Sequence, residues 1–403
     1  MMQAESVLNT EKCFEIIKKN VYLNYPKNKN FHFKFTPRSE FEGFLGQYYN
    51  LNVSFKNKRN KREYLDFFVK LPPIDGPQNN FVEEGDCFKI ELGLYVKIFP
   101  KLQLSKERQL IPKCFLGFDN CLVLEEMVNF KCLDKFDFFS FEHCTVVMKS
   151  IARFHAKSII FEEKKKITVL ELCWRENIKI NLNDCTFQST LDYFVKNLLH
   201  LIDNSEEIDE KEKRMMYRKK IETIALNHFK HTSPINKEIN VLVHADLWTN
   251  NILFKYQNEK VKQCCIVDFQ MARYCAPAYD LLYFLYSTTS ENFRQEKMDS
   301  LLLIYHQTLE ECLMKEANLN VNLIFPFEDL KKSVSKIEVH CMIQAFSIMS
   351  VTLLGHDASF QRINEKMPLT NIVVNEFKNE EKYKFRIMDN LFDLYKKLDD
   401  FDC

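Results

Sequence analysis

The chain has 403 residues, 46% of them hydrophobic and 28% charged, which is the composition of a globular protein with core enough for about two to three domains. Its 56 basic side chains balance its 56 acidic ones, so no net charge would draw the chain onto nucleic acid or an anionic membrane. These values exclude a disordered or fibrous protein and argue against nucleic-acid binding.

Targeting signals and cysteine usage point to the cytoplasm. The first twenty residues include Glu5 and Glu11 and show no secretory pattern, and no apolar run reaches the ~20 residues that span a bilayer. The 14 cysteines are scattered, form no C-x-x-C motif and include the adjacent pair Cys264 and Cys265. We therefore expect reduced thiols in a cytoplasmic protein, no membrane insertion and no obligate protein partner.

The first 124 residues are predicted to form a small β-rich lobe with one helix. Residues 50–55 and 64–71 have the content of strands, and the basic segment between them is predicted to be a solvated hairpin tip. A third strand is predicted over 121–127. Helical spacing of apolar residues predicts a helix that ends before Pro100, with its apolar face at Phe88, Leu92, Tyr95 and Ile98.

Beyond this lobe the pattern is mainly helical. Residues 141–160 and the charged segment 205–229 are predicted to be amphipathic helices. Residues 340–357 form a further apolar helix, broken at Gly355, with Met342, Phe346, Met349 and Leu353 at helical spacing. This apolar stripe is either ordinary core or part of a pocket for an organic ligand, and the sequence leaves both interpretations open.

Three small polar groups end apolar runs in the stretches "VLVHADLWTNNILF" and "QCCIVDFQ". Residues 252–256 and 261–267 are predicted to pair as a hairpin, which would bring Asn251 at its start close to Asp268 at its end. Asp246 lies on the loop that leads into this hairpin. Two carboxylates and an amide oxygen so close together predict a site for a cation such as Mg²⁺ carrying nucleotide phosphates.

The same residues fit the template of phosphoryl transfer. The protein-kinase pattern H-R-D-x-x-x-x-N followed by D-F-G is matched by His244-Ala245-Asp246 with Asn251 and by Asp268-Phe269-Gln270. In the first lobe, Lys70 ends a predicted strand, and Glu91 follows 21 residues later on the predicted helix. A strand lysine and a helix glutamate in this order can form the ion pair that positions the α- and β-phosphates.

The chain resembles the ecdysteroid-kinase-like (CHK-kinase-like) family, which is related to choline and aminoglycoside kinases. The resemblance lies in the motifs "HADLWTNNILFKY", "IVDFQMARYCAPAYDLLYFLYSTT", "LVLEEM", "ARFHA" and "FVKLPP". The resemblance covers nearly the whole chain. It implies an α+β, bilobal, protein-kinase-like fold with a small β-rich N-lobe (1–124), a hinge (125–129) and a large helical C-lobe (130–403).

The resemblance also implies roles for individual residues. Asp246 and Asn251 would be catalytic, with Asp246 as the base, and Asn251 and Asp268 would bind the metal. Asp280 would steady the catalytic loop. The predicted cofactor-binding residues are Gly46, Gln47 and Tyr48 in the phosphate-covering loop, the pair Lys70 and Glu91, and Glu125 and Met127 in the hinge, whose backbone would meet adenine.

These assignments predict an ATP- and Mg²⁺-dependent kinase whose partner is a small hydroxylated molecule, an ecdysteroid or a xenobiotic. Two alternatives stay open, a choline- or ethanolamine-type kinase and a pseudokinase that binds ligand without turnover. The family usually has glycine where this chain has Ala245, and a side chain there is tolerated if the backbone φ is negative.

Overall fold

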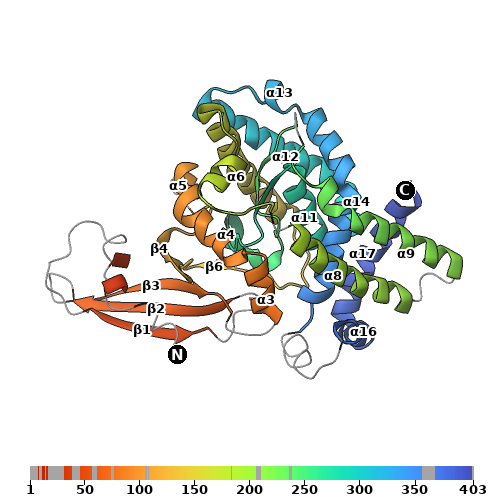
Figure 1. The fold of residues 1–403 in the computed structure, drawn as a ribbon, viewed down its shortest axis with the longest axis horizontal. Helices are drawn as coiled ribbons and strands as arrows, with labels where there is room; N and C mark the ends of the chain where they lie inside the picture. The colour runs from red at the N-terminus through yellow and green to blue at the C-terminus, as the bar shows by residue number, and fades with distance from the viewer. Residues whose placement is uncertain are drawn as a thin grey trace.

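The protein folds into a small β-sheet lobe and a larger, mainly helical lobe (Figure 1). A computed structural model describes residues 8, 11–13, 15–16, 31–38, 46–56, 61–73, 77–104, 107, 109–182, 184–205, 210–235, 238–355 and 368–401. The two lobes agree with the predicted bilobal α+β, protein-kinase-like fold. The boundaries 1–124, 125–129 and 130–403 stay a prediction.

The N-terminal lobe is built around an antiparallel sheet with the strand order β1-β2-β3-β5-β4. Its elements are β1 His32–Pro37, β2 Gln47–Lys56, β3 Arg62–Leu71, α3 Pro77–Glu84, α4 Cys87–Gly93, the π-helix η1 Leu94–Ile98, α5 Phe99–Lys101, β4 Cys114–Phe118 and β5 Cys121–Glu125. The two predicted strands on either side of the basic segment correspond to β2 and β3, while β1 was not predicted. Strand β5 ends at Glu125, two residues earlier than predicted.

Alternation along β3 decides which way Lys70 points. Phe67, Val69 and Leu71 are buried in a core on one face of the sheet. Because successive side chains of a strand point to opposite faces, Phe68 and Lys70 lie on the other face, where Lys70 meets α4. Lys70, the single buried lysine of the sheet strands, therefore lies on the face of the sheet that packs against α4.

The predicted helix before Pro100 is wrong in its end point and in its continuity. Asp86, with φ 50°, separates α3 from α4, and the helical run then continues through η1 and past Pro100 to Lys101. In η1 the amide of Phe99 bonds to the carbonyl of Leu94, so the regular hydrogen-bond pattern is already interrupted. Proline, which has no amide hydrogen to donate, is tolerated directly after this wide turn.

The larger lobe combines long helices with two small sheets, β10-β7 and β6-β8-β9. Its elements are β6 Phe130–Lys131, α6 Phe141–Lys165, α7 Val169–Arg175, α8 Asp184–Asn204, α9 Lys211–Leu226, α10 His228–His231, β7 Val241–Val243, the 3-10 helix η3 Thr249–Asn251, β8 Ile252–Gln257, β9 Lys260–Ile266, β10 Arg273–Cys275, α11 Ala278–Thr288, α12 Glu291–Ala317, α13 Val321–Ile324, α14 Phe327–Thr352, α16 Leu369–Asn379 and α17 Glu381–Asp399. The predicted β8-β9 hairpin and the predicted helix α6 are present. The predicted helix 205–229 is shorter and divided: Ser205 is not helical, α9 ends at Leu226, and α10 begins at His228. Residues 206–209 lie outside the described residues.

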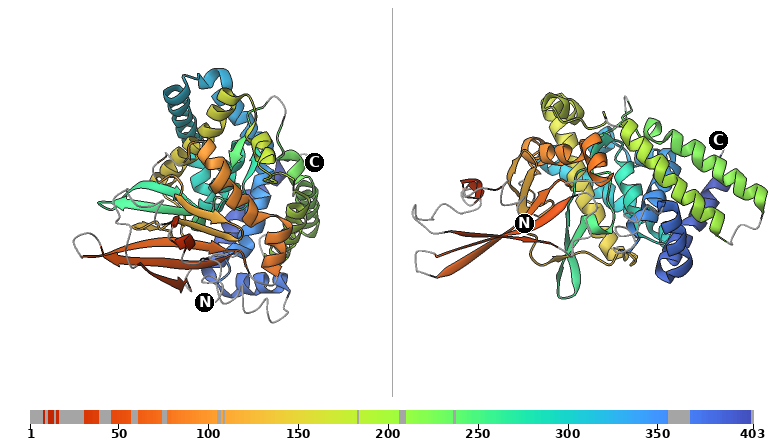
Figure 2. Two further views of the ribbon diagram at one scale, coloured as in Figure 1. Left: turned by 60° about the vertical axis from the view of Figure 1, so that its left-hand side comes forward. Right: turned by 60° about the horizontal axis from the view of Figure 1, so that its bottom comes forward.

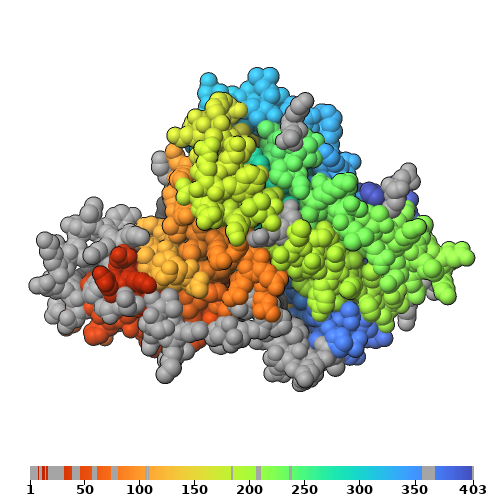
Figure 3. All heavy atoms as spheres, in the orientation of Figure 1, coloured from red at the N-terminus to blue at the C-terminus, as the bar shows by residue number. Residues whose placement is uncertain are grey.

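The second half of helix α14 is buried in the helical lobe, and the helix packs against α8, α11 and α17 (Figure 2). Met342, Phe346, Met349 and Leu353 are all buried, with exposures of 0%, 1%, 3% and 2%. Helices α8 and α9, green in Figure 3, form the right-hand end of the molecule in that view. Because its four apolar side chains are buried, the apolar stripe of α14 belongs to the hydrophobic core.

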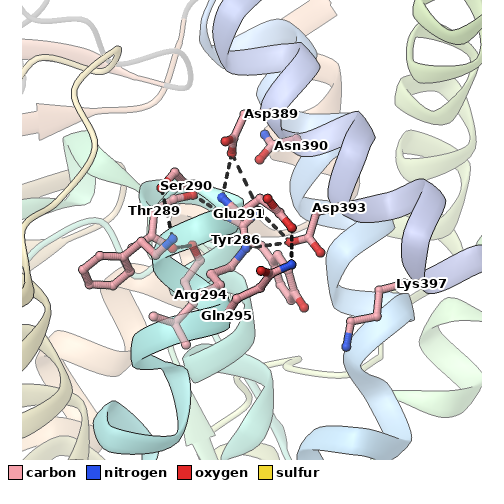
Figure 4. A network of polar contacts seen from close by, with 12 residues as sticks. Tyr286, Thr289, Ser290, Glu291, Arg294, Gln295, Asp389, Asn390, Asp393 and Lys397 are labelled. Carbon is pink, nitrogen blue, oxygen red and sulfur yellow. Dashed lines mark hydrogen bonds and ion pairs between the residues drawn. The ribbon is translucent and has the colours of Figure 1, made fainter. Parts of the chain in front are cut away.

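A buried ion-pair network fixes the C-terminal helix to this lobe (Figure 4). Arg294 near the start of α12 bonds to Asp393 on α17 through Nε (2.8 Å) and Nη2 (2.7 Å). Asp389, one turn earlier on α17, accepts the backbone amide of Glu291 at 3.0 Å. Because the guanidinium and both carboxylates are largely removed from water, removal of one partner would leave a buried charge.

None of the helices within the described ranges combines the length and the apolar character needed to cross a membrane.

Candidate active site

The loop after β7 is held by helix α11. Asp280, which is fully buried in the first turn of α11, accepts the amides of His244 (2.8 Å, Oδ2) and Ala245 (2.8 Å, Oδ1). His155 on α6 bonds to Oδ2 as well, at 3.1 Å. The contacts agree with the predicted role of Asp280 in steadying this loop, and they hold Ala245 at φ 65°.

The hairpin brings Asn251 and Asp268 together as predicted. The amide of Val267, the residue before Asp268, donates to the carbonyl of Asn251 at 3.0 Å. His244 adds a second link, because its Nε2 donates to the Val267 carbonyl (2.8 Å) and its Nδ1 accepts the amide of Asp246 (3.2 Å). Burial lowers the pKa of His244, so the ring stays neutral and can both donate and accept.

Side-chain donors hold both oxygens of the Asp246 carboxylate. Tyr283 Oη on α11 donates to Oδ1 at 3.0 Å, and Asn251 Nδ2 donates to Oδ2 at 2.9 Å. Asn251 Nδ2 also bonds to the Asp246 carbonyl at 2.8 Å. The side-chain nitrogen of Asn251 is thus hydrogen-bonded to Asp246, and the side-chain oxygen of Asn251 is the atom that could bind a metal ion.

The environment of Asp246 suits a proton acceptor at neutral or mildly alkaline pH. Burial, followed by the nearby charge of Asp268, raises the pKa of Asp246 to about 8, although the hydrogen bonds from Tyr283 and Asn251 oppose this shift. A carboxyl group with such a pKa is a stronger base than an ordinary aspartate.

Lys70 joins the two lobes at the site. Its Nζ lies 2.6 Å from Glu91 Oε2 on α4 and 2.8 Å from Asp268 Oδ1 in the larger lobe. Burial opposes protonation of Lys70, but Asp268 and Glu91 outweigh it and raise the pKa of the amine above its usual range. The expected pairing of Lys70 with Glu91 is therefore present, and Lys70 is a cation at the edge of the predicted metal site.

The Asp268-Phe269-Gln270 segment is fixed by packing. Phe269 is fully buried and makes ring contacts with Tyr95, Phe99, Phe154 and His244. Its amide donates to Glu91 Oε1 at 3.1 Å, and Gln270 Nε2 lies 3.4 Å from Asp268 Oδ2. Asp268 itself has φ 68°. The segment is assembled around Asp268 with contacts from both lobes.

The predicted phosphate-covering loop is partly a strand. Gln47 and Tyr48 belong to β2, and Tyr48 pairs in register with Lys70 on β3, so its ring lies over Lys70 with Nζ 6.0 Å from the ring centroid. Gly46 directly precedes the strand, and a side chain there would come within 3.1 Å of Tyr48 Oη. Gly43, the other glycine of this segment, lies outside the described residues.

In the predicted hinge, Glu125 is the last residue of β5 and Met127 follows it in a turn. The backbone amide of Glu125 donates to the backbone carbonyl of Lys113 at 2.8 Å, and the carbonyl of Met127 accepts the amide of Phe130 at 3.1 Å. These two backbone groups are engaged within the protein. Contact of adenine with the rest of this segment stays a prediction.

The ligand set fits a magnesium ion that arrives with a nucleotide. Within the described ranges no cluster of three or more histidine, cysteine, aspartate or glutamate side chains could hold a metal ion. Mg²⁺ does not need one, since it is usually held by one or two protein groups together with phosphate oxygens and water. The Asn251 amide oxygen and the Asp268 carboxylate are suited to that arrangement.

Sequence reasoning assigned no role at this site to two residues, namely Tyr283 and His155. Tyr283 lies three residues after Asp280 on one helix, and positions i and i+3 share a face, so this spacing was the available signal. His155 lies in the motif "ARFHA", which was part of the family resemblance, but no role was assigned to it, since a histidine in an apolar helix is usually only packed.

The two lobes, with an ion pair between β3 and α4 in the smaller lobe and a second one from Lys70 to Asp268 between the lobes, define the class of proteins with a protein-kinase-like fold. Within this class, a sequence profile of the ecdysteroid kinase-like family matches residues 40–317, and the chain belongs to that family. No curated protein sequence matches the chain.

Small-molecule kinases are among the solved structures to which this chain is similar. Choline kinase LicA from Streptococcus pneumoniae is 14% identical, with 86% of this chain and 89% of that chain covered and a TM-score of 0.38. The GDP complex of aminoglycoside 2'-phosphotransferase-IIIa is 12% identical, with 97% and 98% covered and a TM-score of 0.40. The ADP and streptomycin complex of APH(3'')-Id from Streptomyces rimosus is 11% identical, with 74% and 92% covered and a TM-score of 0.34. Because these scores are low, the assignment rests on the family match.

Proposed function

We propose that this protein is an ATP- and Mg²⁺-dependent kinase that phosphorylates a hydroxyl group of a small molecule, an ecdysteroid or a xenobiotic. The observation that carries the proposal is a chain of contacts that links one cation of the smaller lobe with two carboxylates and one amide side chain of the larger lobe. Lys70 bonds to Asp268, Asp268 adjoins Asn251 across the hairpin, and Asn251 bonds to Asp246.

In this proposal each group has one task. Lys70, positioned by Glu91, would contact the α- and β-phosphates, and Asn251 and Asp268 would hold Mg²⁺, which neutralises charge on the phosphate oxygens. The acceptor oxygen would attack the γ-phosphorus while the bond from that phosphorus to the β,γ-bridging oxygen breaks. ADP would leave with the electron pair, and the hydroxyl proton would pass to Asp246.

A panel assay tests the proposal. Purified protein is given MgATP with steroids, phenols, glycosides or choline, and ADP release is measured. Asp246→Asn should bind MgATP as the wild type does but turn over about 10²- to 10⁴-fold more slowly, which is the usual range for a lost general base. The exposed Asp299 on α12 offers the matched control, since Asp299→Asn should leave turnover unchanged.

The pH dependence gives a second readout. The base must be ionised to accept a proton, so kcat/KM of the wild type should fall as the pH drops through about 8, the raised pKa of Asp246. In Asp246→Asn, the residual kcat/KM should no longer fall as the pH drops through this range. Binding of MgATP without phosphoryl transfer to any acceptor or to water would instead support the pseudokinase alternative, and turnover with choline alone would support the choline-kinase alternative.

A further inference from the structure

One face of helix α11 contacts the catalytic loop, residues 244–247, at three positions. Asp280 accepts two backbone amides of the loop, Tyr283 donates to the Asp246 carboxylate, and Ser287 Oγ donates to the Leu247 carbonyl at 3.1 Å. The spacing i, i+3 and i+7 is that of one helix face. The helix is fully buried along its length, so this face is a rigid support for the loop.

Tyr283 differs from its two neighbours because it touches the reacting group itself. Asp280 and Ser287 bond to the backbone, whereas the Tyr283 phenol bonds to Oδ1 of Asp246 at 3.0 Å. Burial and the adjacent Asp246 carboxylate raise the pKa of Tyr283 well above its usual value, so the phenol keeps its proton and acts as the donor.

We propose that Tyr283 is a positioning residue that, together with Asn251, fixes the plane of the Asp246 carboxylate for proton acceptance. Tyr283 holds Oδ1 and Asn251 holds Oδ2, so the carboxylate cannot rotate about its Cβ–Cγ bond without losing a hydrogen bond. The lone pairs that remain then face a defined direction. This inference rests on the proposed kinase function.

The physical consequence concerns the rate and not the binding of nucleotide. A carboxylate free to rotate spends less time aligned with the attacking hydroxyl, and misplacement of a reacting group by about 1 Å can cost about 10²-fold in rate. The Tyr283 phenol bonds to Asp246, whereas Lys70 and Asp268, which would face the phosphates, bond to each other, so removal of the phenol should leave ATP binding intact.

The variant Tyr283→Phe tests the inference, and the same helix supplies a matched control. Tyr286 is also a buried tyrosine of α11, but its phenol donates to Glu338 Oε1 at 2.8 Å, away from Asp246. The probe is ADP release from MgATP with water as the acceptor, which requires no knowledge of the organic substrate. The melting temperature of each variant is measured alongside.

We expect Tyr283→Phe to lower kcat by about 10- to 100-fold with KM for ATP within about twofold of the wild type. Tyr286→Phe should have a lower melting temperature than the wild type and an unchanged kcat. In the background of Asp246→Asn, adding Tyr283→Phe should cause no further loss, because a residue that acts through Asp246 has nothing left to position. Replacement of Tyr283 by 4-aminophenylalanine, which restores a donor, should recover the rate.

An unchanged kcat in Tyr283→Phe, or an equal fall in Tyr286→Phe, would overturn the inference while leaving the proposed function in place. Should Tyr283→Phe be unfolded at the assay temperature, the 4-aminophenylalanine variant decides alone: a rate near wild type supports the inference, and a rate near that of Asp246→Asn overturns it. If the wild type itself releases no ADP with water or with any acceptor of the panel, the proposed function fails and the inference falls with it.

Discussion

Two residues of the candidate site, Ala245 and Asp268, have left-handed backbones, with φ of 65° and 68°. An aspartate tolerates this region better than most residues do, whereas the Cβ of an alanine costs about 1–2 kcal/mol there. The condition that the sequence set for Ala245, a negative φ, is therefore not met. The strain is balanced by the hydrogen bond from the Ala245 amide to Asp280.

Ala245→Gly should relieve that strain. Glycine removes the Cβ penalty but adds about 0.4–1 kcal/mol of unfolded-state entropy, so we expect the free energy of unfolding to stay level or rise by up to about 1.6 kcal/mol. Urea denaturation measures the change. Ala152→Gly in the middle of α6, where the backbone is ordinary helix and the methyl group is buried, is the control and should lower the free energy of unfolding by about 1–2 kcal/mol. A comparable loss in Ala245→Gly would show that the alanine methyl stabilises the loop.

At the scale of elements, helix α11 organises the loop and helix α14 fills the lobe beside it. The sequence left two interpretations of the α14 stripe open, and the structure buries all four of its apolar residues. Met349 also accepts a hydrogen bond at Sδ from Asn390 Nδ2 of α17 at 3.4 Å. A residue so enclosed has no room for a larger side chain.

Met349→Trp should therefore lower the stability of the protein by about 1–3 kcal/mol through overpacking. Any effect on KM for the organic acceptor should be no larger than that on KM for ATP. Differential scanning calorimetry and steady-state kinetics on one preparation test both statements. Leu323→Trp, at a position that is 84% exposed, is the control and should leave the melting temperature unchanged. A selective rise in the acceptor KM at an unchanged melting temperature would instead favour the pocket interpretation.

At the scale of the whole molecule, the site joins the two lobes. Lys70 of the sheet bonds to Asp268 of the larger lobe, and Glu91 of α4 accepts the Phe269 amide. Gly93, two residues after Glu91, lets α4 approach the larger lobe, because a Cβ there would lie 2.6 Å from Ile178. A ligand held by both lobes should stabilise the entire fold.

We expect MgATP to raise the melting temperature of the wild type, since a ligand at 100 times its Kd contributes about 2.7 kcal/mol. Asp268→Ala should abolish this Mg²⁺-dependent shift. The variant also loses an ion pair to Lys70, so the quantity to compare is the shift on adding MgATP and not the melting temperature itself. Wild type with ATP and EDTA is the control for the metal. An undiminished shift in Asp268→Ala would remove Asp268 from metal binding.

The sequence by itself determined strands β2 and β3, the β8-β9 hairpin, helix α6 and the order of the polar groups. Strand pattern, hairpin spacing and the order of Lys70, Glu91, Asp246, Asn251 and Asp268 are local properties, since each depends on residues near one another in the chain or on a motif that can be read directly. The hairpin geometry was enough to bring Asn251 to Asp268. The bilobal fold followed from the same local patterns.

Only the tertiary structure decided what surrounds these groups. The contact of Tyr283 with Asp246 spans 37 positions, and that of His155 with Asp280 spans 125, so no local pattern encodes them. Helical periodicity showed that α14 has an apolar face, but whether protein or ligand covers that face depends on the neighbouring helices. The positive φ of Ala245 has the same origin, because Asp280, from a helix 35 residues away, holds the loop in that conformation.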